Sequence, residues 1–245
     1  MKYFFILFFS LLLAPISSND RPTAEKKPFV VVQLFTSLGC SYCPPADELM
    51  TEIKENYKDQ EVYVLSYHVD YWDRKGWKDP FSKKSFTELQ YSYAKQFKER
   101  RVYTPQVVVN GKDHFNGTYK SKLKKKIKNY LKKEAKNTVV LSYGKNSAGN
   151  LALNYEVIGE ISNKKLKLAF VLKTKTTDTK RNEGHKKMVT NTNIVIEEMM
   201  IDLTSKNKGS ILIPEVTLEV KKDLFVIGYI QNKKLRITGA TQLEF

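Results

Sequence analysis

The order of apolar and polar positions divides the chain into a mixed first half and a β-rich second half. Residues 29–35 are almost all apolar or β-branched, which is typical of a central strand buried on both faces of a parallel sheet. Residues 61–68 alternate and predict a second strand. Between them lies a helical pattern whose apolar positions share one face: Ala46, Leu49, Met50 and Ile53. A strand, a helix and a second strand imply a right-handed parallel crossover.

Helix and strand patterns also follow one another through the rest of the first half. Residues 69–80 form a polar and aromatic loop that holds both tryptophans. The pattern then predicts a helix over 82–101, a strand over 106–110, a short partner strand over 114–117 and a helix over 121–136. Asn110-Gly111 is a hairpin turn signal between the two strands. We therefore expect one α/β domain over residues 28–136.

The second half contains short strand-like runs separated by turns. They cover residues 138–143, 150–157, 165–173, 189–203, 211–220 and 224–231. No convincing helical pattern interrupts them. Several short antiparallel strands over about 100 residues are typical of a β-sandwich. We therefore predict an all-β, sandwich-like C-terminal domain over residues 137–245.

The N-terminal residues resemble an export signal. Lys2 provides a positive start, and residues 3–13 form an apolar run of eleven residues. A membrane span needs about 20 apolar residues, so this run is short for an anchor. We predict a signal peptide over residues 1–18, cleavage after Ser18 and a linker over 19–27. The mature protein is then exported (periplasm, cell envelope or secreted), with no stable membrane span after signal cleavage.

Composition limits the classes of partner. The formal net charge is +16, contributed by 36 Lys and 6 Arg against 26 acidic residues. Lysine-rich, arginine-poor surfaces are more often solvated faces than specific phosphate readers, so no nucleic-acid partner is expected. The hydrophobic content of 41% suffices for two modest cores.

The chain contains only two cysteines, Cys40 and Cys43, placed two residues apart. They lie at the approach to the first predicted helix, whose first turn accommodates Pro44-Pro45 and is favoured by the acidic Asp47. Free N–H groups and the dipole at a helix start stabilise a thiolate. We therefore expect Cys40 to be the exposed nucleophile that forms a mixed disulfide, and Cys43 to resolve it.

Two other interpretations of the cysteine pair are weaker. A disulfide closing a four-residue loop stabilises the fold by only about 2 kcal/mol before strain is subtracted, so a purely structural role explains little. A closed zinc site needs four ligands. Only three histidines are available as partners (His68, His114 and His185), and none has paired ligand spacing. We predict no metal and no other cofactor.

The dipeptide Thr104-Pro105, far from the cysteines in sequence, is a second feature that bears on the fold. Thr104-Pro105 directly precedes the strand at 106–110, and an X-Pro bond before a strand is a plausible place for a cis peptide. Together with the cysteine pair and the order of elements, it gives a thioredoxin-like fold with a helical insertion. The resemblance implies that Pro105 is cis and that Thr104 and Pro105 face the cysteine pair as a substrate-binding element.

The sequence also departs from thioredoxins. The motif is Cys-Ser-Tyr-Cys, and Leu34 occupies the place of the buried thioredoxin acid, six residues before the first cysteine. His68, Asp70 and Trp72 end the second strand or follow it, where open α/β sheets build their sites. They are candidates to tune Cys40. Alternatively, they order the loop through hydrogen bonds and stacking.

A narrower resemblance rests on longer runs: VVQLFTSLGCSYCPPAD, YHVDYWDRKGWKDPFS and VYTPQVVVNG. They resemble the secreted thioredoxin-like family catalogued as domain of unknown function 1223. Residues 181–184 and 190–195 resemble that family's glycine-rich turn and following strand, although the turn has lost a glycine and Asn191 stands where a histidine is expected. The resemblance implies fold and export.

The sequence therefore predicts an exported thiol–disulfide oxidoreductase whose partner is a protein thiol or disulfide. The alternative is a non-catalytic thioredoxin-like binding or assembly module of the cell envelope, in which the disulfide is conformational and the β-rich half is the interaction surface.

Overall fold

The computed structural model describes residues 26–74, 76–180, 186–204, 206–218 and 221–245. The predicted signal peptide over 1–18, most of the linker over 19–27 and the turn at 181–184 lie outside these residues, as does His185. Within the described part, no helix has the length and apolar character needed to cross a membrane.

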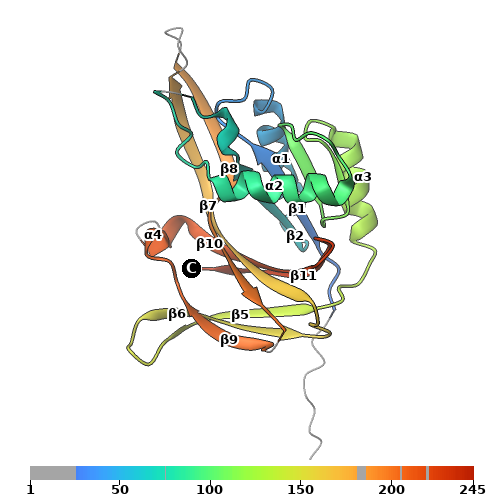
Figure 1. Cartoon of the computed structure of the whole chain (residues 1–245), viewed down its shortest axis with the longest axis vertical. Coiled ribbons are helices and arrows are strands. Elements are labelled where there is room, and N and C mark those ends of the chain that lie inside the picture. The colour runs from blue at the N-terminus through green and yellow to red at the C-terminus, as the bar shows by residue number, and fades with distance from the viewer. Residues whose placement is uncertain (1–25, 75, 181–185, 205, 219–220) are drawn as a thin grey trace, which may run out of the picture.

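The fold is a mixed α/β arrangement of an eight-stranded mixed sheet and a small three-stranded antiparallel sheet (Figure 1). The large sheet has the order β11-β10-β7-β8-β2-β1-β3-β4, and the small one the order β5-β6-β9. In the first half the elements are β1 (Val30–Thr36), α1 (Pro44–Asn56), β2 (Val62–His68), a 3-10 turn η1 (Asp70–Trp72), α2 (Lys84–Phe97), β3 (Gln106–Val109), β4 (Asp113–Asn116) and α3 (Lys120–Tyr130). In the second half they are β5 (Thr138–Lys145), β6 (Leu151–Ile158), β7 (Lys164–Lys180), β8 (Lys186–Asp202), β9 (Lys208–Leu212), α4 (Glu215–Leu218), η2 (Lys221–Asp223), β10 (Leu224–Asn232) and β11 (Ile237–Glu244).

The first half follows the predicted order of elements. β1 and β2 pair in parallel across α1, as the crossover requires. β3 runs antiparallel to β1 and forms a hairpin with β4. Asn110 and Gly111 form the turn, both with positive φ. A Cβ on Gly111 would lie 1.9 Å from the carbonyl oxygen of Leu235, so the turn requires glycine there.

Helices cover both faces of the sheet in this half. Alternate β1 residues, Val30, Val32 and Leu34, pack with the apolar sides of α1 and α3. The other side chains of β1, among them Val31 and Phe35, pack with α2. The predicted helix over 121–136 ends early, at Tyr130. Because α1 crosses the sheet directly after the cysteines, its first turn lies at the carboxyl ends of β1 and β2.

The β-rich half does not form the separate all-β sandwich that was predicted over residues 137–245. Strands β7, β8, β10 and β11 extend the first-half sheet, with β8 placed parallel to β2. The junction is held by side chains: Ser66 Oγ donates to the carbonyl of Thr192 at 2.9 Å, and Asn193 Nδ2 donates to the carbonyl of Val64 at 3.0 Å. The sheet thus crosses the predicted boundary at 136/137, because β8 provides a buried pairing edge for β2.

The small sheet packs against the extended part of the large one, so this region has two layers. Apolar residues of β5 and β6 form one buried cluster with residues of β7 and β10, including Val139, Leu153, Leu168 and Val226. Two elements were predicted wrongly. The run at 211–220 contains the end of β9 and the short helix α4, and β11 was missed.

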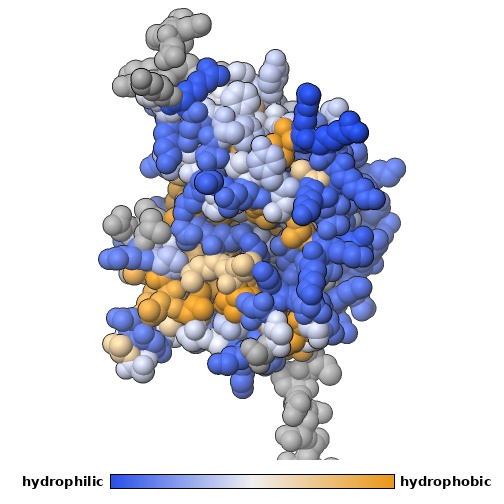
Figure 2. All heavy atoms as spheres, viewed as in Figure 1, coloured by the Kyte–Doolittle hydropathy of each residue, from blue (hydrophilic) through white to orange (hydrophobic). Residues whose placement is uncertain are grey.

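The surface is mainly polar on the face shown in Figure 2, as the lysine-rich composition leads one to expect. Apolar side chains gather in one area of this face, around the C-terminal end of the chain and the small sheet. The C-terminal Phe245 packs on Tyr143 of β5, with ring centroids 4.7 Å apart. This area is separate from the cysteine pair, which lies beside α1.

Candidate functional site at the start of helix α1

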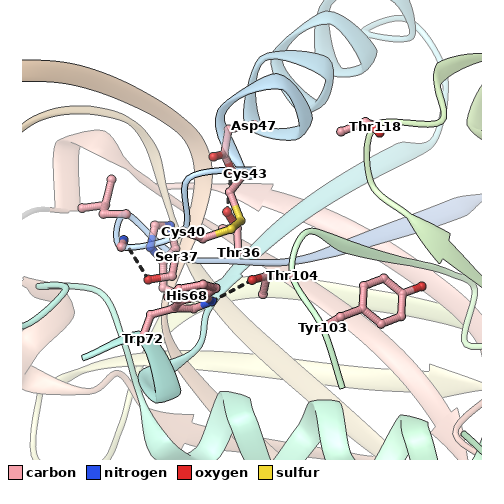
Figure 3. The surroundings of a disulfide bond; sticks show 12 residues. Thr36, Ser37, Cys40, Cys43, Asp47, His68, Trp72, Tyr103, Thr104 and Thr118 are labelled. Atoms are coloured by element: carbon pink, nitrogen blue, oxygen red, sulfur yellow. Dashed lines mark hydrogen bonds between the residues drawn. A yellow bond between two sulfur atoms is a disulfide. The ribbon is translucent and has the colours of Figure 1, made fainter. Parts of the chain in front are cut away.

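The two cysteines form a disulfide at the start of α1 (Figure 3). Their Cα atoms are 5.4 Å apart. Cys43 is the N-cap residue, and Pro44 and Pro45 occupy the first helical positions. The carbonyl of Cys43 accepts hydrogen bonds from the backbone N–H groups of Ala46 at 2.8 Å and Asp47 at 3.1 Å. The helix therefore starts at the second sulfur, in agreement with the sequence.

The accessibility of Cys40 differs from the prediction. Cys40 is 1% exposed and Cys43 is fully buried, whereas Cys40 was expected to be an exposed nucleophile. Two tryptophans pack against the residue before Cys40, because a Cβ on Gly39 would lie 3.0 Å from Trp77 and 3.2 Å from Trp72. In contrast, Tyr42 between the cysteines is 76% exposed. The disulfide therefore lies just beneath a surface marked by an exposed tyrosine.

Thr104 is among the residues that surround the disulfide in Figure 3, and its peptide bond to Pro105 is cis. Pro105 borders the first turn of α1, because a Cβ on Gly117 would touch both Pro105 at 3.2 Å and Ala46 at 3.0 Å. The buried Gln90 of α2 fixes this segment by donating to the carbonyl of Tyr103 at 2.8 Å and to Gln106 at 2.9 Å. The inserted helix thus positions the loop that faces the disulfide.

The three candidate tuning residues divide into different roles. Trp72 Nε1 donates to Thr104 Oγ1 at 2.7 Å, and Trp72 also packs on Gly39, so it connects the two sides of the site. Asp70 instead accepts a hydrogen bond from Thr87 Oγ1 at 2.5 Å and ties η1 to α2. This contact favours the loop-ordering interpretation for Asp70.

His68 is buried at the end of β2 and is paired with Asp79 of the following loop. Its Nδ1 lies 2.8 Å from Asp79 Oδ2, and a carboxylate only accepts, so Nδ1 carries the hydrogen. Asp79 also accepts from Leu38 N at 2.8 Å and from Ser37 Oγ at 3.3 Å. Burial alone would raise the pKa of Asp79, but the hydrogen bond and the charge of His68, with the backbone N–H groups of Leu38 and Phe81, hold that pKa below its ordinary value. Asp79 therefore anchors the loop that leads into Cys40.

A carboxyl that sequence reasoning assigned only to the helix dipole proves to be buried behind the disulfide. Asp47 is 4% exposed and accepts a hydrogen bond from Thr36 Oγ1 at 2.9 Å. Burial raises the pKa of Asp47 from 3.8 to about 7, against the smaller lowering effects of His68, Thr36 and Asn191. The available signal was its spacing of four residues from Cys43, which places both side chains on one face of the helix.

Asn191 completes the polar cluster from β8. It is 1% exposed, and its amide is close enough to Asp47 to act on that residue's pKa. Within the described residues, neither its amide nitrogen nor its amide oxygen has a hydrogen-bond partner, and His68 Nε2 also has none. Thr36, Asp47, His68 and Asn191 therefore form a buried polar cluster between the disulfide and the sheet.

The site brings together a disulfide, which is a redox-active group, and the titratable carboxyl of Asp47. Cys40 and Cys43 can exchange electrons with another thiol or disulfide, and Asp47 can hold or release a proton near neutral pH. Among the described residues, no group of three or more His, Cys, Asp or Glu side chains has an arrangement suited to a metal ion.

Comparisons with known proteins agree with this picture at the level of family and fold. The family described as "Protein of unknown function (DUF1223)" matches residues 31–231. The crystal structure of protein AGR_C_4864 from Agrobacterium tumefaciens is similar, with a TM-score of 0.67 and 25% sequence identity over 90% of this chain and 96% of that one. No curated protein matches.

Proposed function

This chain belongs to the DUF1223 family, and we propose that it is an exported thiol–disulfide oxidoreductase of thioredoxin-like fold acting through Cys40 and Cys43. The observation that carries the proposal is the disulfide at the N-cap of α1. A thiolate formed there lies at the positive end of the helix dipole. The dipole stabilises the anion that thiol–disulfide exchange requires.

The reaction needs only the two cysteines and a client. In the oxidising direction, a client thiolate attacks Cys40 Sγ, the Cys40–Cys43 bond breaks, and its electron pair leaves on Cys43. A second client thiolate then attacks the client sulfur of the mixed disulfide, which releases Cys40 as a thiolate and leaves the client oxidised by two electrons. The reducing direction is the same sequence reversed.

The side chains around the disulfide support a polypeptide client. Thr104 lies across from the sulfurs in Figure 3, with its segment held by Gln90 and its hydroxyl bound by Trp72. Tyr42 is 76% exposed, and Tyr103 and Tyr119 are also exposed. Exposed aromatic rings are the side chains most enriched where proteins bind other proteins. A client segment running past Thr104 and Pro105 would meet the ring of Tyr103, next to Thr104 in the chain, and that of Tyr42 between the two cysteines.

The direct test is to trap the client. Cys43→Ala leaves Cys40 without its resolving partner, so mixed disulfides to Cys40 accumulate in exported extracts and appear as thiol-sensitive bands. Cys40→Ala, which keeps one cysteine of the same pair, is the matched control and traps few clients. Equal trapping by both variants, or none by either, would contradict the proposal.

One observation favours a second candidate, a binding or assembly module of the cell envelope in which the disulfide is structural. Both sulfurs are buried, and a catalytic sulfur must be reached by its client. Alkylation separates the two functions. In the oxidoreductase, reduced Cys40 reacts with iodoacetamide at pH 7 faster than a simple free thiol. In the module it reacts more slowly, because burial hinders access and raises the pKa of the thiol.

A further inference from the structure

Thiol–disulfide exchange at a buried pair requires a proton acceptor next to the buried sulfur. Cys43 is fully buried, so a thiolate there is poorly solvated and its proton has no direct route to water. When Cys43 attacks a mixed disulfide it must lose a proton, and when it leaves the Cys40–Cys43 bond it must gain one. A side chain that holds one proton and exchanges it near neutral pH meets both needs.

On this basis we infer that Asp47 is the proton acceptor and donor for Cys43. The inference rests on the proposed function and adds a third residue to its chemistry. Asp47 lies one helical turn after Cys43, its N–H bonded to the Cys43 carbonyl at 3.1 Å, and both side chains are buried. Figure 3 draws Asp47 and Thr36 together among the residues that surround the disulfide.

The groups packed around Asp47 suit a carboxyl that changes its protonation state. Thr36 of β1 donates to Oδ1 at 2.9 Å, and its hydroxyl can also pass a proton onward. Asn191 of β8 carries an amide donor and an amide acceptor without other partners, so it can donate to the carboxylate or accept from the carboxylic acid. Of the titratable groups, His68 of β2 faces Asp47 and favours its ionised form, whereas Asp79 opposes it.

The proton balance closes in both directions. In the oxidised protein, a client thiolate attacks Cys40 Sγ, and the Asp47 acid gives its proton to the departing Cys43 Sγ. The products are a mixed disulfide at Cys40, a Cys43 thiol and an Asp47 carboxylate. In the reverse direction, the carboxylate takes the Cys43 proton while Cys43 Sγ attacks Cys40 Sγ, and the client leaves as a thiolate. Burial raises the pKa of Asp47 to about 7, so both forms are present at neutral pH.

The test measures how fast dithiothreitol reduces the disulfide of the full chain between pH 5 and pH 9. Rates are followed by quenching with N-ethylmaleimide and mass spectrometry, and divided by the thiolate fraction of dithiothreitol at each pH. In the wild type, the corrected rate is high while Asp47 holds its proton and falls as pH rises through about 7. Asp47→Asn removes that step and slows reduction about tenfold at pH 6.

Two further variants sharpen the assignment. Glu48→Gln removes a carboxyl from the same helical turn but on the exposed side, and keeps the wild-type profile. Thr36→Val removes the hydrogen bond that favours the carboxylate, so it moves the midpoint of the profile to higher pH. A shift of the midpoint is a readout that loss of packing alone does not produce.

The outcomes separate the inference from the proposed function. A wild-type disulfide that dithiothreitol cannot reduce in the folded protein would overturn both. If dithiothreitol reduces the wild-type disulfide and Asp47→Asn shows the same dependence of the corrected rate on pH, only the role of Asp47 is overturned. If Asp47→Asn does not fold, the 13C carboxyl resonance of Asp47 in the wild type decides, because a coupled carboxyl titrates with different midpoints in the oxidised and reduced protein. Equal midpoints would overturn the inference.

Discussion

The buried carboxyl of Asp47 predicts an unusual dependence of stability on pH. Asp47→Asn is the perturbation, because the amide keeps the size of the side chain and can still accept from Thr36 but does not titrate. The disulfide stays oxidised throughout, so stability is measured independently of redox chemistry.

The magnitude follows from linkage between ionisation and folding. Burial raises the pKa of Asp47 from 3.8 to about 7 in the folded protein. Each unit of pKa corresponds to about 1.4 kcal/mol, so ionising Asp47 costs about 4 kcal/mol more in the folded protein than in the unfolded chain. Because the folded-state pKa is the higher one, the proton contributes its full stabilisation below pH 3.8 and none above about pH 8.

The assay is urea unfolding of the oxidised wild type and of Asp47→Asn at pH 5 and pH 9, followed by circular dichroism. Other groups titrate in both proteins, so the informative quantity is the difference between the two unfolding free energies. Relative to the variant, the wild type loses about 3 kcal/mol between pH 5 and pH 9. The unfolding free energy of the variant relative to that of the wild type is therefore higher at pH 9 than at pH 5.

Two results would refute this reasoning. A difference that does not change between pH 5 and pH 9 means that Asp47 has the same pKa in the folded and unfolded states. A change of opposite sign means that the carboxylate, not the acid, is the form that the fold stabilises, as in an ion pair. Glu48→Gln in the same helical turn controls for the loss of one exposed negative charge.

Three further predictions concern the frame around the site. Asp79→Ala removes the acceptor of four buried or partly buried hydrogen bonds, so it lowers the urea-unfolding free energy by about 3 kcal/mol or more; a loss below about 1 kcal/mol would contradict its anchoring role. Thr104→Val removes the acceptor of Trp72 Nε1, which costs about 1–2 kcal/mol and changes tryptophan fluorescence in the folded state. Gly111→Ala meets a backbone oxygen at 1.9 Å and costs more in the same unfolding assay than Gly149→Ala, which has positive φ but no atom within 4 Å.

The first half was predictable because its patterns are strong and local. A continuous apolar run, a crossover helix and the Asn110-Gly111 turn each determine one element from adjacent residues, and all three occur where expected. Helix ends were less accurate: the expected 121–136 helix ends at Tyr130, although Leu131 still packs against the apolar core that holds α3.

The second half was harder because strand partners depend on contacts that are distant in sequence. The sequence predicts strands over 165–173 and 189–203, where the structure has the longer β7 and β8, yet nothing local shows that β8 lies against β2. The pairing is carried by single side-chain contacts such as Ser66 Oγ to the Thr192 carbonyl, which alternation cannot reveal. β11 was missed because Thr238, Thr241 and Gln242 interrupt its apolar positions.

Burial at the site also depends on distant contacts. The Thr104–Pro105 bond is cis as expected, but Cys40 was predicted to be exposed and is not. Beside it, Gly39 is packed against Trp72 and Trp77, which come more than thirty residues later in the chain. The partnership of His68 with Asp79 likewise joins the end of a strand to a later loop position.

The position of Leu34 lacks an acid and helix α1 provides one at Asp47, and both positions face the same layer of the fold. Leu34 and Thr36 alternate on the β1 face that packs under α1, so a side chain at either position enters the layer behind the cysteines. Asp47 enters the same layer from the helix, four residues after Cys43, and reaches Thr36. An acid can therefore be supplied from the strand or from the helix, and the layer requires only one, because two buried carboxyls would repel each other. The spacing Cys-x-x-Cys-x-x-x-Asp, in a chain whose preceding strand has an apolar residue at the position of Leu34, is then a sequence signal for this arrangement. Replacing Leu34 by Asp while changing Asp47 to Leu tests the equivalence, and a corrected reduction rate that again falls near neutral pH would support it.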